Sequence, residues 1–212
     1  MGKFVIIVVI IGAFLLILGS VRRFRPSPCP WWLTCVLDNR YMEFFAGSVP
    51  LIRRIGLTSG MRVLDVGCGP GRIAIPVAQY VGTEGEVVAM DIQEKMLQKL
   101  EKRAKEHEIT NIRTVLAGVG HGMLPERSVF DRVLLVTVLG EIPDKKSALT
   151  EIFEALKPGG MLSVTEVFLD PDYQSRRKIR KLIGEAGFEY EHTFGTMYAF
   201  TLNCRKPIVS HT

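Results

Sequence analysis

The residues best suited to chemistry form one short stretch, V-L-D-V-G-C-G-P-G-R, from Val63 to Arg72. An apolar run leads into a turn in which every second position is a glycine: Gly67, Gly69 and Gly71. Glycine tolerates positive φ and lets a backbone approach a ligand without an intervening Cβ. A helix that begins at Arg72 would direct its unpaired N–H groups into the same loop. The stretch therefore predicts a ligand-binding turn between a buried strand and a helix.

The spacing of these glycines distinguishes among the known glycine loops. A phosphate-binding P-loop requires G-x-x-x-x-G-K-[ST], and no Lys-Ser/Thr pair follows here. A dinucleotide loop reads G-x-G-x-x-G, whereas this loop is G-x-G-x-G with Asp65 just before it. A carboxylate at a strand tip repels a pyrophosphate but suits a cationic ligand with an amino group, such as S-adenosylmethionine (SAM). In this motif, D-x-G-x-G-x-G, the chain resembles the class I SAM-dependent methyltransferases.

A second acidic residue supports this interpretation. Residues 86–90 form a β-type run that ends in Asp91, about 20 positions beyond the glycine loop. In a βαβ unit that distance places a carboxylate at the tip of the second strand, where it can accept hydrogen bonds from both ribose hydroxyls. The resemblance implies further cofactor contacts at Cys68 in the loop, Ile92 beside the adenine, Gly118 and Val119 after the third strand, and Leu139 near the methyl group.

One position departs from the family pattern. After its third strand the family usually carries Gly-Asp, whose Asp accepts a hydrogen bond from the adenine amino group. Here Gly118 is followed by Val119 in an enlarged loop, G-V-G-H-G-M-L-P. Either His121 or a backbone group replaces this contact, or His121 is an exposed loop residue. The departure bears on how adenine is recognised more than on which cofactor binds.

The chemistry of methyl transfer sets what else the site needs. Displacement at a sulfonium has an excellent leaving group, so the main task is to align the acceptor and exclude water. Glu141 is the candidate for a polar contact to the acceptor, orienting an amine or acting as a base, although the helix dipole also favours a carboxylate at a helix start. Glu166 is open to the same two interpretations, and Tyr41 is either part of a lid or a core residue.

The order of elements predicts how these residues are positioned. Apolar periodicity indicates strands at 61–66, 86–90, 112–117, 132–138 and 161–168, helices at 38–54, 72–80, 93–107, 143–157 and 172–186, and a closing hairpin at 188–194 and 197–204. Alternating strands and helices predict a doubly wound α/β sheet. The hairpin resembles the family's reversed last strand, so the expected fold is a Rossmann-like seven-stranded sheet. The likeness is greatest to quinone and sterol C-methyltransferases, with some likeness to phospholipid N-methyltransferases and membrane-anchored thiol methyltransferases.

The amino terminus has a different composition. Residues 4–21 are uncharged and almost wholly apolar, close to the ~20 residues of a membrane-spanning helix. Arg22, Arg23 and Arg25 follow this run, which by the positive-inside rule places the catalytic domain in the cytoplasm. A cleaved signal peptide is the alternative, but these arginines stand where its small-residue site should lie. The expected organisation is a transmembrane anchor at 1–21, a linker at 22–37, a cap helix at 38–60 and the methyltransferase domain at 61–212.

Composition narrows the partners. The formal net charge of +5 is modest, and no basic stripe interleaved with aromatic residues indicates a nucleic acid. The four cysteines show no C-x-x-C pair or metal-ligand spacing, so no metal is expected. We therefore expect a single-pass, membrane-anchored SAM-dependent methyltransferase with a lipophilic small-molecule or lipid acceptor. Amino-phospholipid headgroups come first, then quinone precursors and hydrophobic thiols; a non-catalytic SAM-binding scaffold is the alternative that turnover would exclude. The oligomeric state stays open.

Overall fold

The computed structural model describes residues 48–122, 124, 126–168 and 170–208. The predicted anchor, the linker, Tyr41 and the first part of the cap helix lie outside these ranges. The strands are β1 (Arg62–Val66), β2 (Glu86–Asp91), β3 (Ile112–Leu116), β4 (Phe130–Val136), β5 (Leu156–Val167), β6 (Glu189–Gly195) and β7 (Ala199–Arg205). The helices are α4 (Ser48–Arg54), α5 (Ala74–Val81), α6 (Glu94–Glu106), α7 (Lys145–Ala155) and α8 (Arg176–Glu185).

The strands form one seven-stranded sheet in the order β3-β2-β1-β4-β5-β7-β6. Neighbours from β3 to β5 pair in parallel, whereas β7 runs antiparallel to both β5 and β6. This confirms the predicted doubly wound, Rossmann-like sheet with a reversed last strand. Because the chain passes from β1 outward to β3 and then back to β4, the direction of winding changes between β1 and β4. Ligands bind at the carboxyl ends of the strands at such a switch point.

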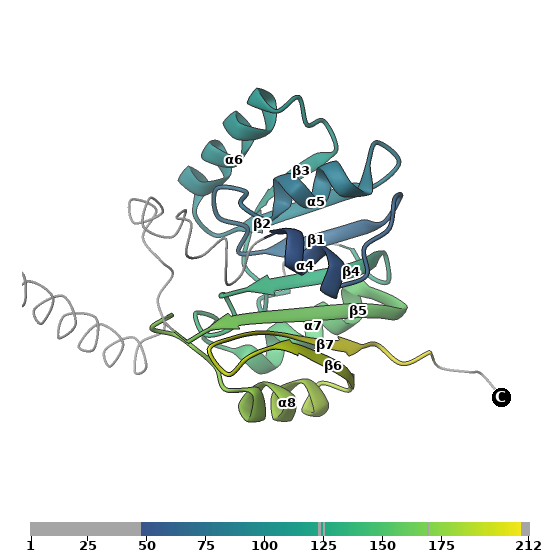
Figure 1. Ribbon diagram of the computed structural model, residues 1–212, viewed down its shortest axis with the longest axis vertical. Coiled ribbons are helices and arrows are strands. Elements are labelled where there is room, and N and C mark those ends of the chain that lie inside the picture. Colours follow the sequence, from purple (N-terminus) through teal and green to yellow (C-terminus); the bar gives the residue numbers. More distant parts are fainter. Residues whose placement is uncertain (1–47, 123, 125, 169, 209–212) are drawn as a thin grey trace, which may run out of the picture.

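Helices cover both faces of the sheet, with α4 and α5 on one side and α7 on the other (Figure 1). Consecutive strand residues alternate between two cores: Val63 packs with the α5 and α6 side, and Leu64 with the α7 and α8 side. Central strands of this kind are apolar on both faces, which explains their almost continuous hydrophobic runs. Among the described residues, no helix combines the length and apolar character that crossing a bilayer requires.

Several element boundaries differ from the sequence-based expectation. The helix α5 begins at Ala74 and not at Arg72, and β4 spans Phe130–Val136 instead of 132–138. The helix α7 ends at Ala155, and the Lys157-Pro158-Gly159-Gly160 segment belongs to β5 instead of ending a helix. There Phe130 pairs with Leu156 and Arg132 with Met161, so the intervening residues bulge out of the ladder. The helix α8 begins at Arg176, not at 172, because the Ser175 side chain caps it by accepting a hydrogen bond from the Lys178 N–H at 3.4 Å.

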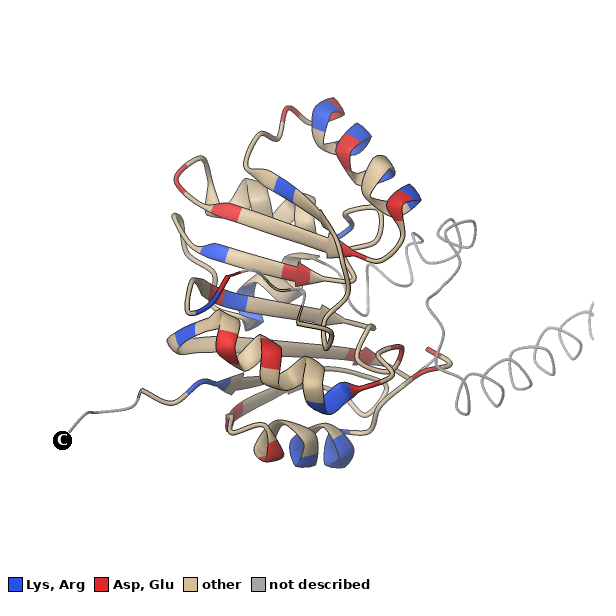
Figure 2. Cartoon of the chain, turned by 180° about the vertical axis from the view of Figure 1, so that it is seen from behind, with Lys and Arg blue, Asp and Glu red and all other residues tan. Residues whose placement is uncertain are grey.

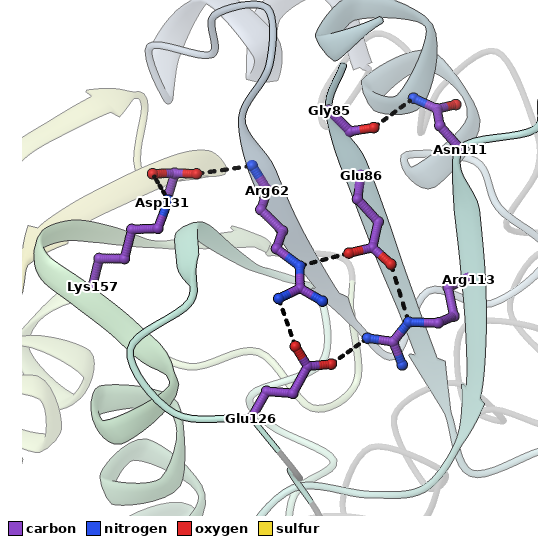
Figure 3. A network of polar contacts seen from close by, with 8 residues as sticks. All are labelled: Arg62, Gly85, Glu86, Asn111, Arg113, Glu126, Asp131 and Lys157. Atoms are coloured by element: carbon purple, nitrogen blue, oxygen red, sulfur yellow. Dashed lines mark hydrogen bonds and ion pairs between the residues drawn. The ribbon is translucent and has the colours of Figure 1, made fainter. Parts of the chain in front are cut away.

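An ionic network joins the strands at the amino-terminal edge of the sheet (Figure 3). Arg62 of β1 pairs with Glu86 of β2 at 2.5 Å and with Glu126 at 2.6 Å, and Arg113 of β3 contacts both carboxylates. Asp131 of β4 accepts a hydrogen bond from the Arg62 N–H at 2.8 Å. Single exposed ion pairs contribute little, but a connected network, here with each arginine bridging two carboxylates, is the more favourable case. It fastens β1 to β4 at the edge opposite the carboxyl ends.

Candidate active site

A cavity of about 340 Å³ opens at the carboxyl edge of the sheet, between the loops that follow β1, β2, β3 and β4. This is the switch point of the fold. Most predicted site residues line its wall: Asp65, Gly67, Cys68, Gly69, Asp91, Ile92, Gly118, Val119 and Glu141. Gly71 and Leu139 are not in the wall, and Tyr41 lies outside the described residues.

The glycine loop adopts the positive φ that its composition predicts, with φ of 67° at Gly67, 52° at Gly69 and 86° at Gly71. A Cβ at Gly67 would lie 2.6 Å from Val138 Cγ2, and one at Gly71 would lie 2.9 Å from Leu100 Cγ. These two glycines are therefore required by close packing as well as by φ. A Cβ at Gly69 would meet no atom within 4 Å. Gly71 thus packs against Leu100 outside the cavity wall, whereas Gly69 lies in the wall.

Asp65 is the most unusual group in the cavity. It sits in β1 with 2% of its surface exposed, and its Oδ2 has no hydrogen-bond partner among the described residues. Burial raises the pKa of this carboxyl to about 7; the nearby Arg72 lowers it, and the charge of Asp91 adds to the rise. A buried acceptor without a donor is costly unless a ligand satisfies it. The amino group of SAM carries both the charge and the donors that Asp65 lacks.

Asp91 ends β2 and ties two loops together. Its Oδ2 accepts a hydrogen bond from the Gly69 N–H at 2.9 Å, and its Oδ1 accepts one from the Gln93 N–H at 2.8 Å. Burial raises the pKa of Asp91, and these two backbone donors oppose the rise. A carboxylate has about four lone-pair sites, so both oxygens can still accept from a vicinal diol. The geometry fits the ribose role that the sequence predicts.

The wall on the adenine side is mostly apolar. Ile92 is 55% exposed at the cavity, so it does not belong to the core. Val119, which stands where the family usually has Asp, is buried at the cavity wall, and His121 lines the cavity with an exposed side chain. No carboxylate from this loop is therefore available to adenine, and the backbone and His121 are the polar groups of residues 117–121 in the wall.

Sequence reasoning missed the residue that holds this loop. Glu151 of α7 accepts hydrogen bonds from the backbone N–H of Gly120 and, at 2.6 Å, from that of Leu124. The loop and α7 are about thirty positions apart in the chain, and an acidic residue in a helix carries no local signal of such a contact. The enlarged loop is thus ordered against α7.

The segment after β4 forms the wall on the side expected for the acceptor. Thr137 has a φ of 57°, and the chain then turns so that Val138, Glu141 and Ile142 line the cavity. Leu139, which the resemblance places near the methyl group, is instead fully buried in the core. Lys145 fastens the turn from α7, donating to the carbonyls of Gly140 at 3.1 Å and Ile142 at 2.6 Å.

Glu166 lies outside the cavity wall. It is 1% exposed on the α7 and α8 side of β5, and its Oε2 accepts a hydrogen bond from the Gln174 N–H at 3.1 Å. Its Oε1 has no hydrogen-bond partner within the described ranges, and burial raises the pKa of the carboxyl to about 8. Of the two predicted acceptor-side carboxylates, the structure therefore brings only Glu141 into the cavity.

The fold and the acid-glycine loop together define a class, and the family comparison agrees. Residues 57–192 match the family model described as a methyltransferase domain, and the chain belongs to that family. With its topology, its D-x-G-x-G-x-G loop and the carboxylate at the end of β2, the domain is a class I SAM-dependent methyltransferase domain.

Curated relatives match part of the chain. The demethylmenaquinone methyltransferase of Geobacillus kaustophilus (strain HTA426) is 36% identical over 111 residues, which are 52% of this chain and 47% of that protein. The demethylmenaquinone methyltransferase of Lactococcus lactis subsp. lactis (strain IL1403) is 34% identical over 115 residues, 54% of this chain and 45% of that protein. The chain thus spans about half the length of the curated relatives it matches.

Solved structures share the fold at low identity. A SAM-dependent methyltransferase from Aquifex aeolicus superposes with a TM-score of 0.77 at 19% identity, covering 85% of this chain and 100% of that one. Magnesium protoporphyrin IX methyltransferase from Synechocystis PCC 6803, solved with bound SAM, gives a TM-score of 0.63 at 22% identity, covering 78% and 79%. These likenesses show the architecture, and the acceptor has to be argued separately.

Proposed function

We propose that the protein transfers the methyl group of SAM to a lipophilic acceptor at a membrane surface. The observation that supports the cofactor half is the buried Asp65 Oδ2, an acceptor for which the described part of the chain supplies no donor, in the same cavity as Asp91. One carboxylate suits a primary amine, and the other suits a diol. SAM presents both groups, whereas a dinucleotide would bring a pyrophosphate toward the buried carboxylate of Asp65.

In this proposal some cavity residues hold the cofactor and others contact the acceptor. When bound, SAM supplies an electrophilic methyl group. Asp65 holds the amino end and Asp91 the ribose, while the apolar side chains of Val138 and Ile142 exclude water from the cavity. Glu141, in the same wall, is placed to orient an acceptor or take its proton.

The acceptor follows from the lining and from the chain's composition. The β4 side of the wall carries Val136, Val138, Ile142 and Pro143 beside Thr137 and Glu141, and this mostly apolar lining favours a lipophilic partner. The apolar run at 4–21, interpreted as an anchor, would keep the domain at the cytoplasmic face of a bilayer. We infer an amino-phospholipid headgroup as the first candidate, because Glu141 offers a carboxylate to an amine.

A quinone precursor is the second candidate. The specific support is that the curated relatives bear the name demethylmenaquinone methyltransferase, at 36% and 34% identity over about half of the chain. A phenolic acceptor has to lose a proton, and Glu141 would then act as a base instead of holding an amine.

The test is product identification with the full chain. The protein is incubated with methyl-labelled SAM and vesicles of phosphatidylcholine that contain phosphatidylethanolamine, a reduced demethylated naphthoquinone, or neither. Label in a methylated ethanolamine headgroup supports the first candidate, and label in the quinone supports the second. Asp65→Asn is the control that should remove either product. Binding of SAM with no labelled lipid in any mixture would instead favour a non-catalytic scaffold.

The membrane location needs its own measurement. Protease added outside intact cells or spheroplasts should leave the catalytic domain whole, because the domain is proposed to lie on the cytoplasmic side. Recovery of the full chain in the soluble fraction, or digestion of the domain from outside, would contradict the anchored arrangement.

A further inference from the structure

Three large side chains are exposed together at one corner of the sheet: Phe168 at 55%, Met197 at 65% and Tyr198 at 57%. Phe168 follows β5, and the other two precede β7, with the Phe168 N–H donating to the Tyr198 carbonyl at 2.7 Å. The rings of Phe168 and Tyr198 lie 6.0 Å apart in edge contact. Because β7 is antiparallel to β5, this corner lies at the carboxyl edge, as the cavity does.

A basic helix adjoins this corner. The first turn of α8 carries Arg176, Arg177 and Lys178 and no acidic residue, and Arg180 and Lys181 follow. Positive charge at a helix amino terminus is opposed by the helix dipole. Figure 2 shows the basic turns at the end of α8 that lies toward the carboxyl edge. Arg176 links the two features, donating to the carbonyls of Gly195 at 3.2 Å and Thr196 in the hairpin.

Both features suit a surface that contacts a partner. Exposed large apolar side chains in a group mark an interaction surface. The cations of α8, of which Lys181 lies 3.8 Å from Glu185, gain further from an anionic partner because the helix dipole opposes positive charge at this end. A bilayer interface has a layer of acyl chains and, outside it, a layer of phosphate headgroups. The aromatic side chains of this corner suit the boundary with the acyl chains, and the neighbouring Lys and Arg suit the phosphates. Anionic headgroups attract each such cation at the membrane surface.

We propose that this aromatic-basic corner, formed by Phe168, Met197, Tyr198, Arg177, Lys178 and Lys181, docks on a bilayer containing anionic phospholipid. The inference rests on the proposed function, because docking would turn the cavity mouth toward the membrane that supplies the proposed acceptor. The strand β5 is the neighbour of β4, and β4 the neighbour of β1. Phe168, after β5, is therefore two strand spacings, roughly 10 Å, from β1 and its glycine loop, and Met197 and Tyr198, before β7, are three spacings, roughly 15 Å, away. This is a short path for an acceptor leaving the bilayer.

The experiment places an environment-sensitive probe on the corner of the full chain. Met197→Cys is labelled with a nitrobenzoxadiazole dye in a chain whose Cys29 and Cys35 are replaced by Ser; Cys68 and Cys204 are buried. Emission is recorded with vesicles of phosphatidylcholine alone or mixed with phosphatidylglycerol. We expect a blue shift, and quenching by brominated acyl chains, only with phosphatidylglycerol. Lys102→Cys on α6, at the far edge of the sheet, is the matched probe that should not shift.

Charge variants test the second half of the proposal. The triple variant R177Q/K178Q/K181Q should lower the ratio of docked to undocked protein at least tenfold, since each cation near an anionic surface contributes roughly a fivefold factor. The matched triple variant K95Q/K102Q/K105Q on α6 should leave the shift unchanged. A shift that persists in R177Q/K178Q/K181Q, or that is equal on both kinds of vesicle, overturns the proposal. A shift that grows with protein concentration in the absence of lipid would identify a second copy as the partner and also overturns it.

Calorimetric SAM binding separates this inference from the proposed function. Both triple variants should bind SAM as the parent chain does, because none of the substituted residues lines the cavity. SAM binding without docking contradicts the docking surface alone. Loss of SAM binding in the parent chain contradicts the proposed function, whatever the probe on the corner reports.

Discussion

The carboxylate of Asp91 accepts a hydrogen bond from the backbone N–H of Gly69 at 2.9 Å. The tip of β2 therefore holds the glycine loop that follows β1, and the Gly67 and Cys68 N–H groups donate to the Met90 carbonyl at 2.8 and 3.0 Å. The contact to Gly69 comes from the side chain that we propose to bind ribose. Asp91 would thus both hold the loop and recognise the cofactor.

Replacing Asp91 should therefore weaken SAM binding in two ways. Asp91→Ala removes the ribose acceptors and the contact to Gly69, and we expect a loss of a few kcal/mol in binding free energy. Asp91→Asn keeps one acceptor oxygen, so its affinity for SAM should lie between that of the parent chain and that of Asp91→Ala. Titration calorimetry with SAM and S-adenosylhomocysteine measures both variants. Unchanged affinity in Asp91→Ala, or tighter binding of NAD than of SAM by the parent chain, would contradict the assigned role.

SAM affinity should rise with pH up to about 7. The pKa of Asp65 is raised to about 7 by burial, so the free carboxyl is protonated in acid and must ionise to bind a cation. Between about pH 5 and 7 the dissociation constant should fall by up to about tenfold per pH unit and then level off. Asp65→Asn should bind more weakly and without this slope. A parent chain whose affinity does not change over that range would contradict the role of Asp65.

The steric role of Gly67 can be separated from its φ. Gly67→Ala brings a Cβ to 2.6 Å from Val138 Cγ2 at a φ of 67°, and we expect a loss of about 2–4 kcal/mol of unfolding free energy from overpacking and strain. Adding Val138→Ala should recover the packing part, which leaves about 1–2 kcal/mol of backbone strain. Chemical denaturation of both single variants and the double variant measures the coupling. Purely additive effects would show that the contact with Val138 does not matter.

Glu141→Gln should lower turnover more than it lowers SAM affinity. The side chain lies in the cavity wall on the proposed acceptor side, and an interaction made mainly in the transition state is seen in kcat. Rate measurements on the acceptor that takes up label, combined with SAM calorimetry, provide the comparison. Gln174→Ala, in a buried residue outside the wall, is the control. Equal turnover in Glu141→Gln and the parent would remove Glu141 from the mechanism.

Glu166 should make the fold less stable as the solution becomes alkaline. Its folded pKa is raised from 4.5 to about 8, so the folded state holds its proton more tightly than the unfolded chain does. Stability is complete below about pH 4.5, falls as pH rises toward 8, and is then constant, with a loss on the order of a few kcal/mol. Melting temperatures between pH 5 and 9 should decline less in Glu166→Gln. Asp65 contributes in the same direction, so the difference between the two proteins is the measured quantity.

The sequence by itself determined the features that depend on neighbouring residues. The D-x-G-x-G-x-G turn, the acid at the second strand tip and the alternation of strands and helices are local patterns, because φ preference, chain reversal and burial periodicity act over a few positions. From these, the cofactor class, the parallel sheet and the positions of Asp65 and Asp91 followed. The missing family Asp at Val119 was also visible in the sequence.

The tertiary structure decided which side chains share a space. It placed Leu139 in the core, drew Lys157–Gly160 into β5, set Glu151 of α7 under the loop after β3, and gathered Phe168, Met197 and Tyr198 beside α8. Each of these outcomes depends on contacts between segments far apart in the chain, and hydrophobic burial is non-directional. Local patterns state that a residue is apolar or acidic; only the packed sheet and helices determine which neighbour it meets.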